Sequence, residues 1–131
     1  MPTAVTIRDE TSLGETTNEL TLEFLDERVT VRELIRSRVY QEVTEFNARQ
    51  AGLFKGLIQP KDAERTPGGF RLSKPRRLDW EEQFRKAIQA FGRNGFLILL
   101  DDRQLDDLDE VIELRHDATV SFLRLVPLIG G

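Results

Sequence analysis

The feature that most constrains the fold is the last stretch of the sequence, residues 118–131, which reads as one strand followed by a short tail. Thr119 to Val126 are rich in β-branched and large apolar side chains, which is typical of a buried strand. Pro127 has no N–H for a strand ladder, so we expect strand pairing to stop there. Gly130 and Gly131 lack a Cβ and hold no fixed shape by themselves. The stretch therefore predicts a strand inside a sheet and a slim tail that leaves the fold.

The first part of the sequence predicts a hairpin and a helix. Ala4 to Arg8 and Glu19 to Leu25 read as two antiparallel strands, joined by a turn at residues 11–14. Thr30 and Glu33 form a capping box, in which the Thr30 hydroxyl accepts from the Glu33 N–H. Apolar residues then recur at helical spacing: Val31, Leu34, Ile35, Val39, Val43 and Phe46. We expect a helix of about 20 residues, roughly 30 Å long, that ends near Gly52.

A second helix is predicted after the cap residue Asp79, and it ends at Gly92 before a turn at residues 94–95. Its aromatic stripe could form a partner groove, but packing against the first helix is the better interpretation; the stripe is Trp80, Phe84, Ala87, Ile88 and Phe91. Residues 96–100 are continuously apolar, as in a central strand covered on both faces. We expect a short edge strand at residues 103–105, an irregular crossover to residue 114 and a turn at residues 115–117.

Residues 53–79 are the unusual part of the sequence, because they contain glycine and proline at many positions. A loop this long is uncommon in a compact domain and is usually functional or disordered. Residues 52–58 could pair as a short strand, and residues 66–70 resemble a turn rather than a phosphate loop, which would need a lysine. Residues 55–77 are basic, whereas residues 101–117 are acidic. We expect 55–77 to be loosely packed and to face a partner, so that deletion of residues 62–74 leaves the fold intact.

The composition excludes several classes of function. The 131 residues fit one domain, and the absence of cysteine excludes thiol nucleophiles, disulfides and cysteine metal sites. His116 is the only histidine, and the carboxylates at residues 101, 102, 106 and 107 lack the spacing of a calcium loop. We therefore expect no catalytic residue and no metal site, and the chain is not expected to be an enzyme. Net charge is −4, which argues against general nucleic-acid binding.

The sequence shows neither a signal pattern near Met1 nor an apolar run long enough to cross a bilayer. A cytoplasmic protein without a membrane partner is therefore expected.

The ending Val126-Pro127-Leu128-Ile129-Gly130-Gly131 resembles that of ubiquitin-like proteins and of the MoaD/ThiS sulfur carriers. Both groups finish a five-stranded β-grasp fold with a last strand and a protruding Gly-Gly, and the resemblance covers residues 1–45 and 97–131. It implies an α+β fold, a β-grasp (ubiquitin-like) mixed sheet with a long first helix and an inserted loop plus second helix. It further implies one domain at residues 1–131, with the insertion at about 51–95 and a C-terminal Gly-Gly tail at 127–131. In that fold the last strand lies in the middle of the sheet, parallel to the first.

The resemblance implies that the reactive group is the carboxylate of Gly131, which a partner enzyme activates with ATP as an acyl-adenylate. The chain itself would need no cofactor. A narrow channel in the activating enzyme would explain Gly130 and Gly131, because side chains there would block it. Leu128 and Ile129 would give the activating enzyme an apolar docking surface, and Pro127 would lower the entropy lost when the tail is bound.

Three functions remain open. The preferred one is a bacterial ubiquitin-like modifier, which an activating enzyme passes to a conjugating enzyme and then to a protein target, with a deubiquitinase-like peptidase as a further partner. The extra mass of residues 51–95 favours it, because a minimal sulfur carrier does not need that surface. The alternative is a MoaD/ThiS-type sulfur carrier with a C-terminal thiocarboxylate, which the apolar tail favours. The third is a non-covalent β-grasp adaptor, whose binding would persist after removal of the tail.

Overall fold

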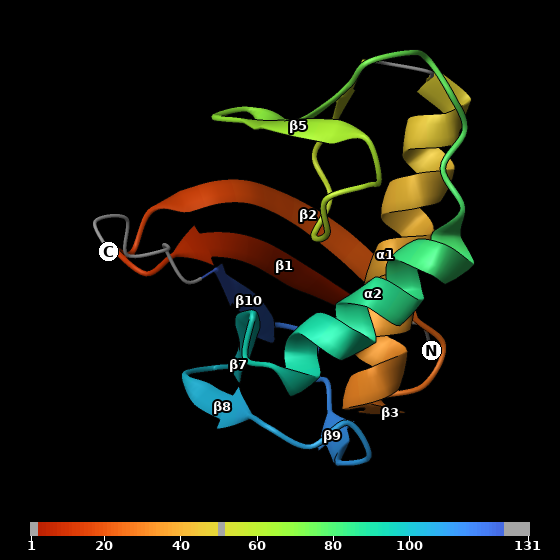
Figure 1. Cartoon of the computed structure of the whole chain (residues 1–131). Helices are drawn as coiled ribbons and strands as arrows, with labels where there is room; N and C mark the ends of the chain where they lie inside the picture. Colours follow the sequence, from red (N-terminus) through yellow and green to blue (C-terminus); the bar gives the residue numbers. More distant parts are fainter. Residues whose placement is uncertain (1–2, 50–51, 125–131) are drawn as a thin grey trace. The chain divides into compact units, whose positions relative to one another are not determined.

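The computed structural model describes residues 3–49 and 52–124 and has a mixed α+β fold (Figure 1). These residues form two compact units. Unit 1 comprises the residues up to Leu34 and those from Ala90 onward, and unit 2 comprises Ile35–Gln89. None of the helices in the described ranges is long and apolar enough to span a membrane. The elements in chain order are β1 (Thr3–Thr11), β2 (Thr16–Phe24), β3 (Arg28–Thr30), α1 (Val31–Arg49), β4 (Leu53–Phe54), β5 (Ala63–Thr66), β6 (Gly69–Leu72), α2 (Trp80–Gly92), β7 (Phe96–Leu100), β8 (Arg103–Leu105), β9 (Val111–Glu113) and β10 (Thr119–Arg124).

Unit 1 is built around a five-stranded mixed sheet in the order β2-β1-β10-β7-β8. β1 and β2 form the predicted antiparallel hairpin, whose turn places Gly14 at a φ of 86°. β10 runs parallel to β1 and antiparallel to β7, where Phe122 lies opposite Ile98. The expectation that the last strand lies in the middle of the sheet, parallel to the first, is therefore confirmed.

One face of this sheet supplies the core of unit 1. Successive side chains of a strand point to opposite faces, so every second residue turns into the core. The buried set on the sheet includes Val5, Ile7, Leu22, Phe24, Phe96, Ile98, Leu105, Val120 and Phe122. Phe96 contacts both Phe91 and Phe122, with ring centroids 5.8 Å apart in each pair. Full burial contributes about 1.5–3 kcal/mol for each large apolar side chain, so this face is a major source of the unit's stability.

The predicted edge strand is confirmed as β8, which pairs with β7 alone in the sheet order. Asp101 and Asp102 join the two strands with φ angles of 47° and 75°. A two-residue loop with both φ angles positive is a type I′ turn, whose twist matches that of the flanking strands. Aspartate tolerates the left-handed region better than most residues, which explains this acidic pair at the turn.

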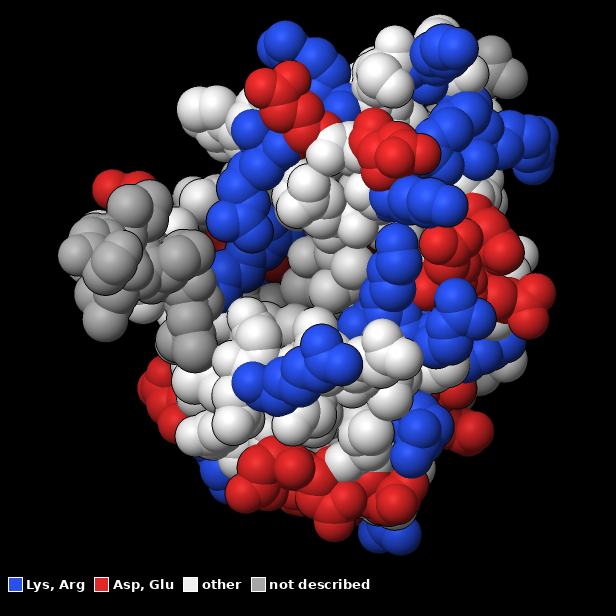
Figure 2. All heavy atoms as spheres, viewed as in Figure 1, with Lys and Arg blue, Asp and Glu red and all other residues white. Residues whose placement is uncertain are grey.

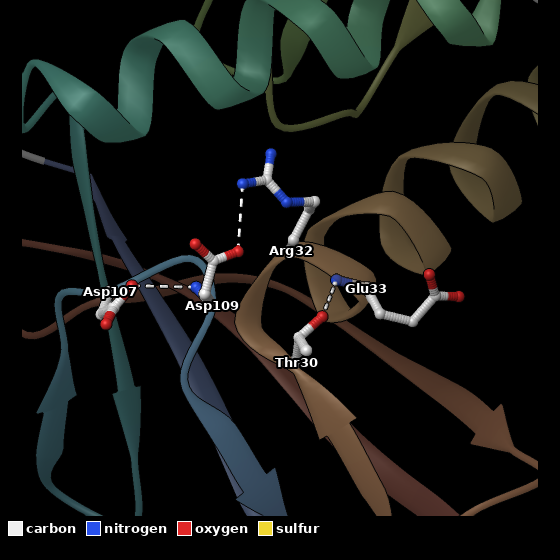
Figure 3. Close-up of polar contacts among 5 residues, drawn as sticks. All are labelled: Thr30, Arg32, Glu33, Asp107 and Asp109. Atoms are coloured by element: carbon white, nitrogen blue, oxygen red, sulfur yellow. Dashed lines mark hydrogen bonds and ion pairs between the residues drawn. The ribbon is translucent and has the colours of Figure 1, made fainter.

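A second, two-stranded sheet pairs β3 with β9, so the prediction of an irregular crossover is wrong for β9. The crossover also completes the start of α1. The N–H groups of Val31 and Arg32 donate to the carbonyls of Glu110 and Leu108, at 3.1 and 3.0 Å. The Arg32 guanidinium pairs with Asp109 at 3.3 Å (Figure 3). N–H groups in the first turn of a helix have no partner within the helix, so the crossover satisfies two of them.

The predicted cap of α1 is confirmed, since the Thr30 hydroxyl accepts from the Glu33 N–H at 3.1 Å (Figure 3). Thr30→Ala removes this bond and is expected to lower the free energy of unfolding by about 1 kcal/mol. Thr44→Ala is the matched control, because it deletes the same atoms at an exposed position inside α1. Urea denaturation measures both variants. Equal stability of the two variants would show that the cap contributes nothing.

Within unit 2, α1 presents a buried face as predicted: Ile35, Val39, Val43 and Phe46 are all buried. The whole helix has 19 residues and ends at Arg49, close to the expected length and before Gly52. Phe46 meets Phe54 of β4 edge to face, with ring centroids 5.3 Å apart.

The prediction that residues 55–77 form a loose loop is wrong. β4, β6 and β5 form a three-stranded antiparallel sheet, and Phe54, Phe70 and Leu72 are buried on it. Thr66 and Gly69 close the β5–β6 hairpin through a 2.8 Å bond from the Thr66 hydroxyl to the Gly69 carbonyl, as the predicted turn requires. Deleting residues 62–74 would remove β5, β6 and two buried side chains, so the expectation of an intact fold is withdrawn for unit 2.

Gly69 is required by the geometry of this hairpin. Its φ is 141°, and a Cβ there would lie 2.8 Å from the Phe54 carbonyl oxygen. Gly69→Ala is expected to lower the free energy of unfolding by about 1–3 kcal/mol, because it adds backbone strain to a steric clash. Gly52→Ala is the matched control, since a Cβ at Gly52 meets nothing within 4 Å. Thermal denaturation measures both variants. Equal melting temperatures would contradict the role assigned to Gly69.

The second predicted helix is confirmed as α2, with the Asp79 carboxylate accepting from the Glu81 N–H at 3.0 Å. Trp80 contacts Tyr40 edge to face at 5.3 Å, and the Arg36 guanidinium lies 5.1 Å from the centroid of the Trp80 ring. The interpretation of the aromatic stripe as packing on the first helix is therefore confirmed at Trp80.

Candidate functional site

The residues with predicted roles, Pro127, Leu128, Ile129, Gly130 and Gly131, lie outside the described residues. The candidate site is therefore built from β10, the strand that leads to them. Its last described residue, Arg124, lies opposite Thr11 of β1 and Phe96 of β7. The described part of the predicted strand at residues 119–126 is thus paired on both sides along most of its length.

The core-facing side of β10 fixes this strand in place. Val120 and Phe122 are fully buried, and the Phe122 ring packs on Phe96. At its start, the Thr119 N–H donates to the Asp101 carboxylate at 3.2 Å, and the Asp101 N–H donates to the Thr119 carbonyl at 3.1 Å. The acidic turn before β8 therefore holds the beginning of β10, a role that the sequence analysis missed.

The opposite side of β10 carries a half-buried apolar strip. Leu123 lies opposite Leu97, and Ser121 lies opposite Leu99. Leu97, Leu99 and Leu123, the outer-face leucines, are all half-buried, whereas Phe96 and Ile98 on the core face are fully buried. The prediction of a strand covered on both faces is therefore confirmed at Phe96 and Ile98, whereas the other face of β7 is only half-buried.

A charged pair and hydroxyl groups border the outer-face leucines. Arg8 lies opposite Ser121 on the neighbouring β1, and Thr6 lies opposite Thr119. The Arg8 guanidinium pairs with Glu19 of β2 at 3.3 Å, and both side chains are about half exposed. An apolar strip with a polar border has the composition of a protein-binding surface. It lies on the strand from which the predicted tail continues.

The other candidate residues do not form a catalytic group. His116 is exposed in the turn before β10. No group of three or more histidine, aspartate or glutamate side chains in the described ranges could hold a metal ion. Of the acidic segment, Asp109 and Glu110 pair with Arg32 and Arg103, at 3.3 and 2.8 Å. These two carboxylates therefore have structural partners.

Comparison with known proteins gives no relative: no protein-family model, no curated protein and no solved structure matches this chain.

Proposed function

We propose that this chain is a ubiquitin-like protein modifier with a β-grasp fold, of the bacterial type, whose Gly131 carboxylate is joined to a target amine. The carboxylate would belong to the encoded chain or be exposed by a deubiquitinase-like peptidase. The observation that carries the proposal is the position of β10, in the middle of the sheet and parallel to β1. This is the place of the last strand in the family that the tail sequence resembles.

The order of the remaining elements supports the same proposal. A β1–β2 hairpin leads to α1, and β7 and the short edge strand β8 precede β10. A helix after the first hairpin and a sheet closed by the last strand are what the β-grasp resemblance implies. The predicted insertion at about 51–95 contains the three-stranded sheet and α2, and most of it lies in unit 2 together with most of α1.

The proposed chemistry needs only the terminal carboxylate from this chain. A carboxylate oxygen attacks the α-phosphorus of ATP in the activating enzyme, and pyrophosphate leaves. A cysteine thiolate of that enzyme then attacks the acyl carbon, forms a thioester and releases AMP. After transfer to the cysteine of a conjugating enzyme, an amine of the target attacks the thioester, forms an amide and releases the thiol.

The structure suggests how an activating enzyme would hold the chain during these steps. The outer-face leucines offer apolar area on the strand that leads to the tail, and Leu128 and Ile129 would extend it. β10 is anchored by Val120 and Phe122, so the enzyme would bind a preorganised strand.

The test is an activation assay with the chain ending at Gly131 and an adenylating enzyme encoded beside its gene. ATP–pyrophosphate exchange is expected only when both proteins are present. A covalent enzyme–chain adduct that dithiothreitol cleaves is expected next. Absence of both signals with an adenylating enzyme shown to be active would contradict the proposal.

A second function is favoured by the tail sequence, since Pro127, Leu128 and Ile129 resemble the ending of a sulfur carrier more than the basic tail of ubiquitin. Mass spectrometry separates the two fates. A thiocarboxylate replaces one oxygen of Gly131 with sulfur in the released protein, whereas conjugation links Gly131 to a lysine or an N-terminus of another protein. An adaptor would do neither, and its binding would survive removal of residues 127–131.

A further inference from the structure

Seven exposed lysine and arginine side chains surround the three-stranded sheet of unit 2. Arg65 lies opposite Phe70 and Arg71 follows Phe70 in β6, so these two point to opposite sides of the sheet. The group as a whole is here called the basic face: Lys55, Lys61, Arg65, Arg71, Lys74, Arg76 and Arg77. Figure 2 shows basic side chains gathered around β5 and the segment that leads to α2. Within the described residues of unit 2, none of the seven forms an ion pair with a carboxylate. Asp62 and Glu64, the latter opposite Arg71, are the two carboxylates of residues 55–77, so this segment keeps a net positive charge.

The basic face is held on an ordered support. Lys55 follows the buried Phe54, and Arg71 lies between the buried Phe70 and Leu72. The Arg76 guanidinium donates to the Lys61 carbonyl, so the segment before α2 is attached to the turn before β5. Fixed charges lose less entropy on binding than charges on a disordered loop do, which favours recognition over simple solvation.

The two units carry net charges of opposite sign. Residues 35–89 contain 12 basic and 7 acidic residues, a net charge of +5, and the remaining residues contain 7 and 16, a net charge of −9. Much of the negative charge lies in the acidic segment, residues 101–117. Asp102, Asp106 and Asp117 are exposed there and have no ion pair within the described residues of unit 1. Val111 of the same segment is 61% exposed, so it adds apolar surface there.

We propose that the basic face binds the acidic segment of a second copy of this chain. Charge complementarity favours a second copy of the chain as the partner. Each copy carries both the basic face and the acidic segment, and these have opposite net charge. A polyphosphate such as a nucleic acid fits less well, since the net charge of −9 on unit 1 would repel it. The contact joins two different surfaces, so it is heterologous and can build chains or rings of molecules.

This association is expected to depend strongly on salt. Exposed charges attract over about 30 Å at 0.01 M salt and only about 8 Å at 0.15 M. Sedimentation velocity of the full chain should show species larger than the monomer at low salt, and these should dissociate as sodium chloride is added. A monomer at every salt concentration, at the highest protein concentration measured, would overturn the proposal.

Two charge-reversal variants test which surfaces meet. The basic-face variant is Arg65→Glu with Lys74→Glu, and the acidic-segment variant is Asp106→Lys with Asp117→Lys. These four residues are exposed, and each makes no ion pair within the described residues of its own unit. Asp101 and Asp102 are left unchanged because their positive φ angles would strain a lysine. Each variant alone is expected to weaken self-association at least ~10-fold. Circular dichroism melts confirm that both are folded.

Mixing the two variants gives the decisive result. The acidic segment of the first and the basic face of the second are both intact, so an equimolar mixture is expected to form a 1:1 complex that grows no further. A chain with all four substitutions is expected to regain part of its self-association, because the charges are exchanged at those four positions. Failure to form the 1:1 complex would overturn the proposal, as would binding of a fluorescent single-stranded oligonucleotide through the basic face without self-association.

The proposal does not depend on the proposed function. A chain that lacks residues 127–131 is expected to self-associate as the full chain does, although it would not be activated. Loss of self-association on tail removal would show instead that the tail, rather than the basic face, makes the contact.

Discussion

A Gly131→Val variant is expected to lose ATP-dependent activation completely while keeping the thermal stability of the unchanged chain. If the carboxylate of Gly131 reacts in a narrow channel of an activating enzyme, as proposed, the β-branched side chain of valine would block that channel. Rates of ATP–pyrophosphate exchange measure the loss, and circular dichroism melts measure stability. Gly52→Val is the matched control, because a Cβ at Gly52 meets nothing within 4 Å, and this variant is expected to be activated normally.

The same prediction can be tested without changing any residue. One additional C-terminal residue that no peptidase removes would move the carboxylate away from Gly131, so activation should again be lost. If either modified chain is activated at the unchanged rate, the carboxylate of Gly131 is not the reacting group. If activation is lost but the cellular role remains, the adaptor function is the better explanation.

The elements that the sequence predicts correctly are those with strong local patterns. The stripe from Val31 to Phe46 repeats over several turns and is introduced by the Thr30 cap, so both the type and the start of α1 could be predicted. The alternation of Leu22 and Phe24 within β2 predicted a half-buried strand in the same way. A long periodic segment determines its own conformation, and the order of such segments led to the correct place of the last strand.

The elements that were missed are short and are stabilised by distant partners. β3 and β9 have three residues each and pair across most of the length of the chain, so neither shows a period of its own. Between β5 and β6, Pro67 and Gly69 correctly indicated a turn. Because both residue types are typical of loops, the strands on either side of the turn were not predicted. Phe70 and Leu72 were the available signal, since two apolar residues at a spacing of two are what a short half-buried strand shows.

The candidate site could be predicted only in part. The sequence placed it at the end of the last strand, but the outer-face leucines were hidden because residues 96–100 are all apolar and show no alternation. Only the structure separates the fully buried Phe96 and Ile98 from the half-buried Leu97 and Leu99. Identifying such a surface needs the register between neighbouring strands, which no single segment contains.

The helix α1 also contains a buried ion pair that the sequence analysis did not identify. Arg38 and Glu42 continue the row of Leu34 and Phe46 at a spacing of four residues, so all four share one face of the helix. The side chain of Arg38 is 0% exposed and that of Glu42 is 8% exposed. The two groups are hydrogen-bonded, and the Leu57 N–H donates to the second carboxylate oxygen of Glu42 at 3.0 Å. Glu42 therefore connects α1 to the segment after β4 within unit 2.

Glu42→Ala is expected to lower the free energy of unfolding by about 3–5 kcal/mol, because it leaves Arg38 buried without this carboxylate and removes the acceptor of the Leu57 N–H. Glu45→Ala, an exposed position on the same helix, is the matched control and is expected to change stability by less than about 0.5 kcal/mol. Urea denaturation measures both variants. Similar stability of the two would show that the ion pair contributes little.

A double variant separates the cost of burying Arg38 without the Glu42 carboxylate from the contribution of the pair itself. Arg38→Met with Glu42→Leu removes both charges and keeps the apolar volume, so no buried charge remains to be compensated. Its stability is expected to lie well above that of Glu42→Ala, because the desolvated guanidinium causes most of the loss in the single variant. If the double variant is as unstable as Glu42→Ala, the essential contact is instead the one between Glu42 and the Leu57 N–H, which leucine cannot replace.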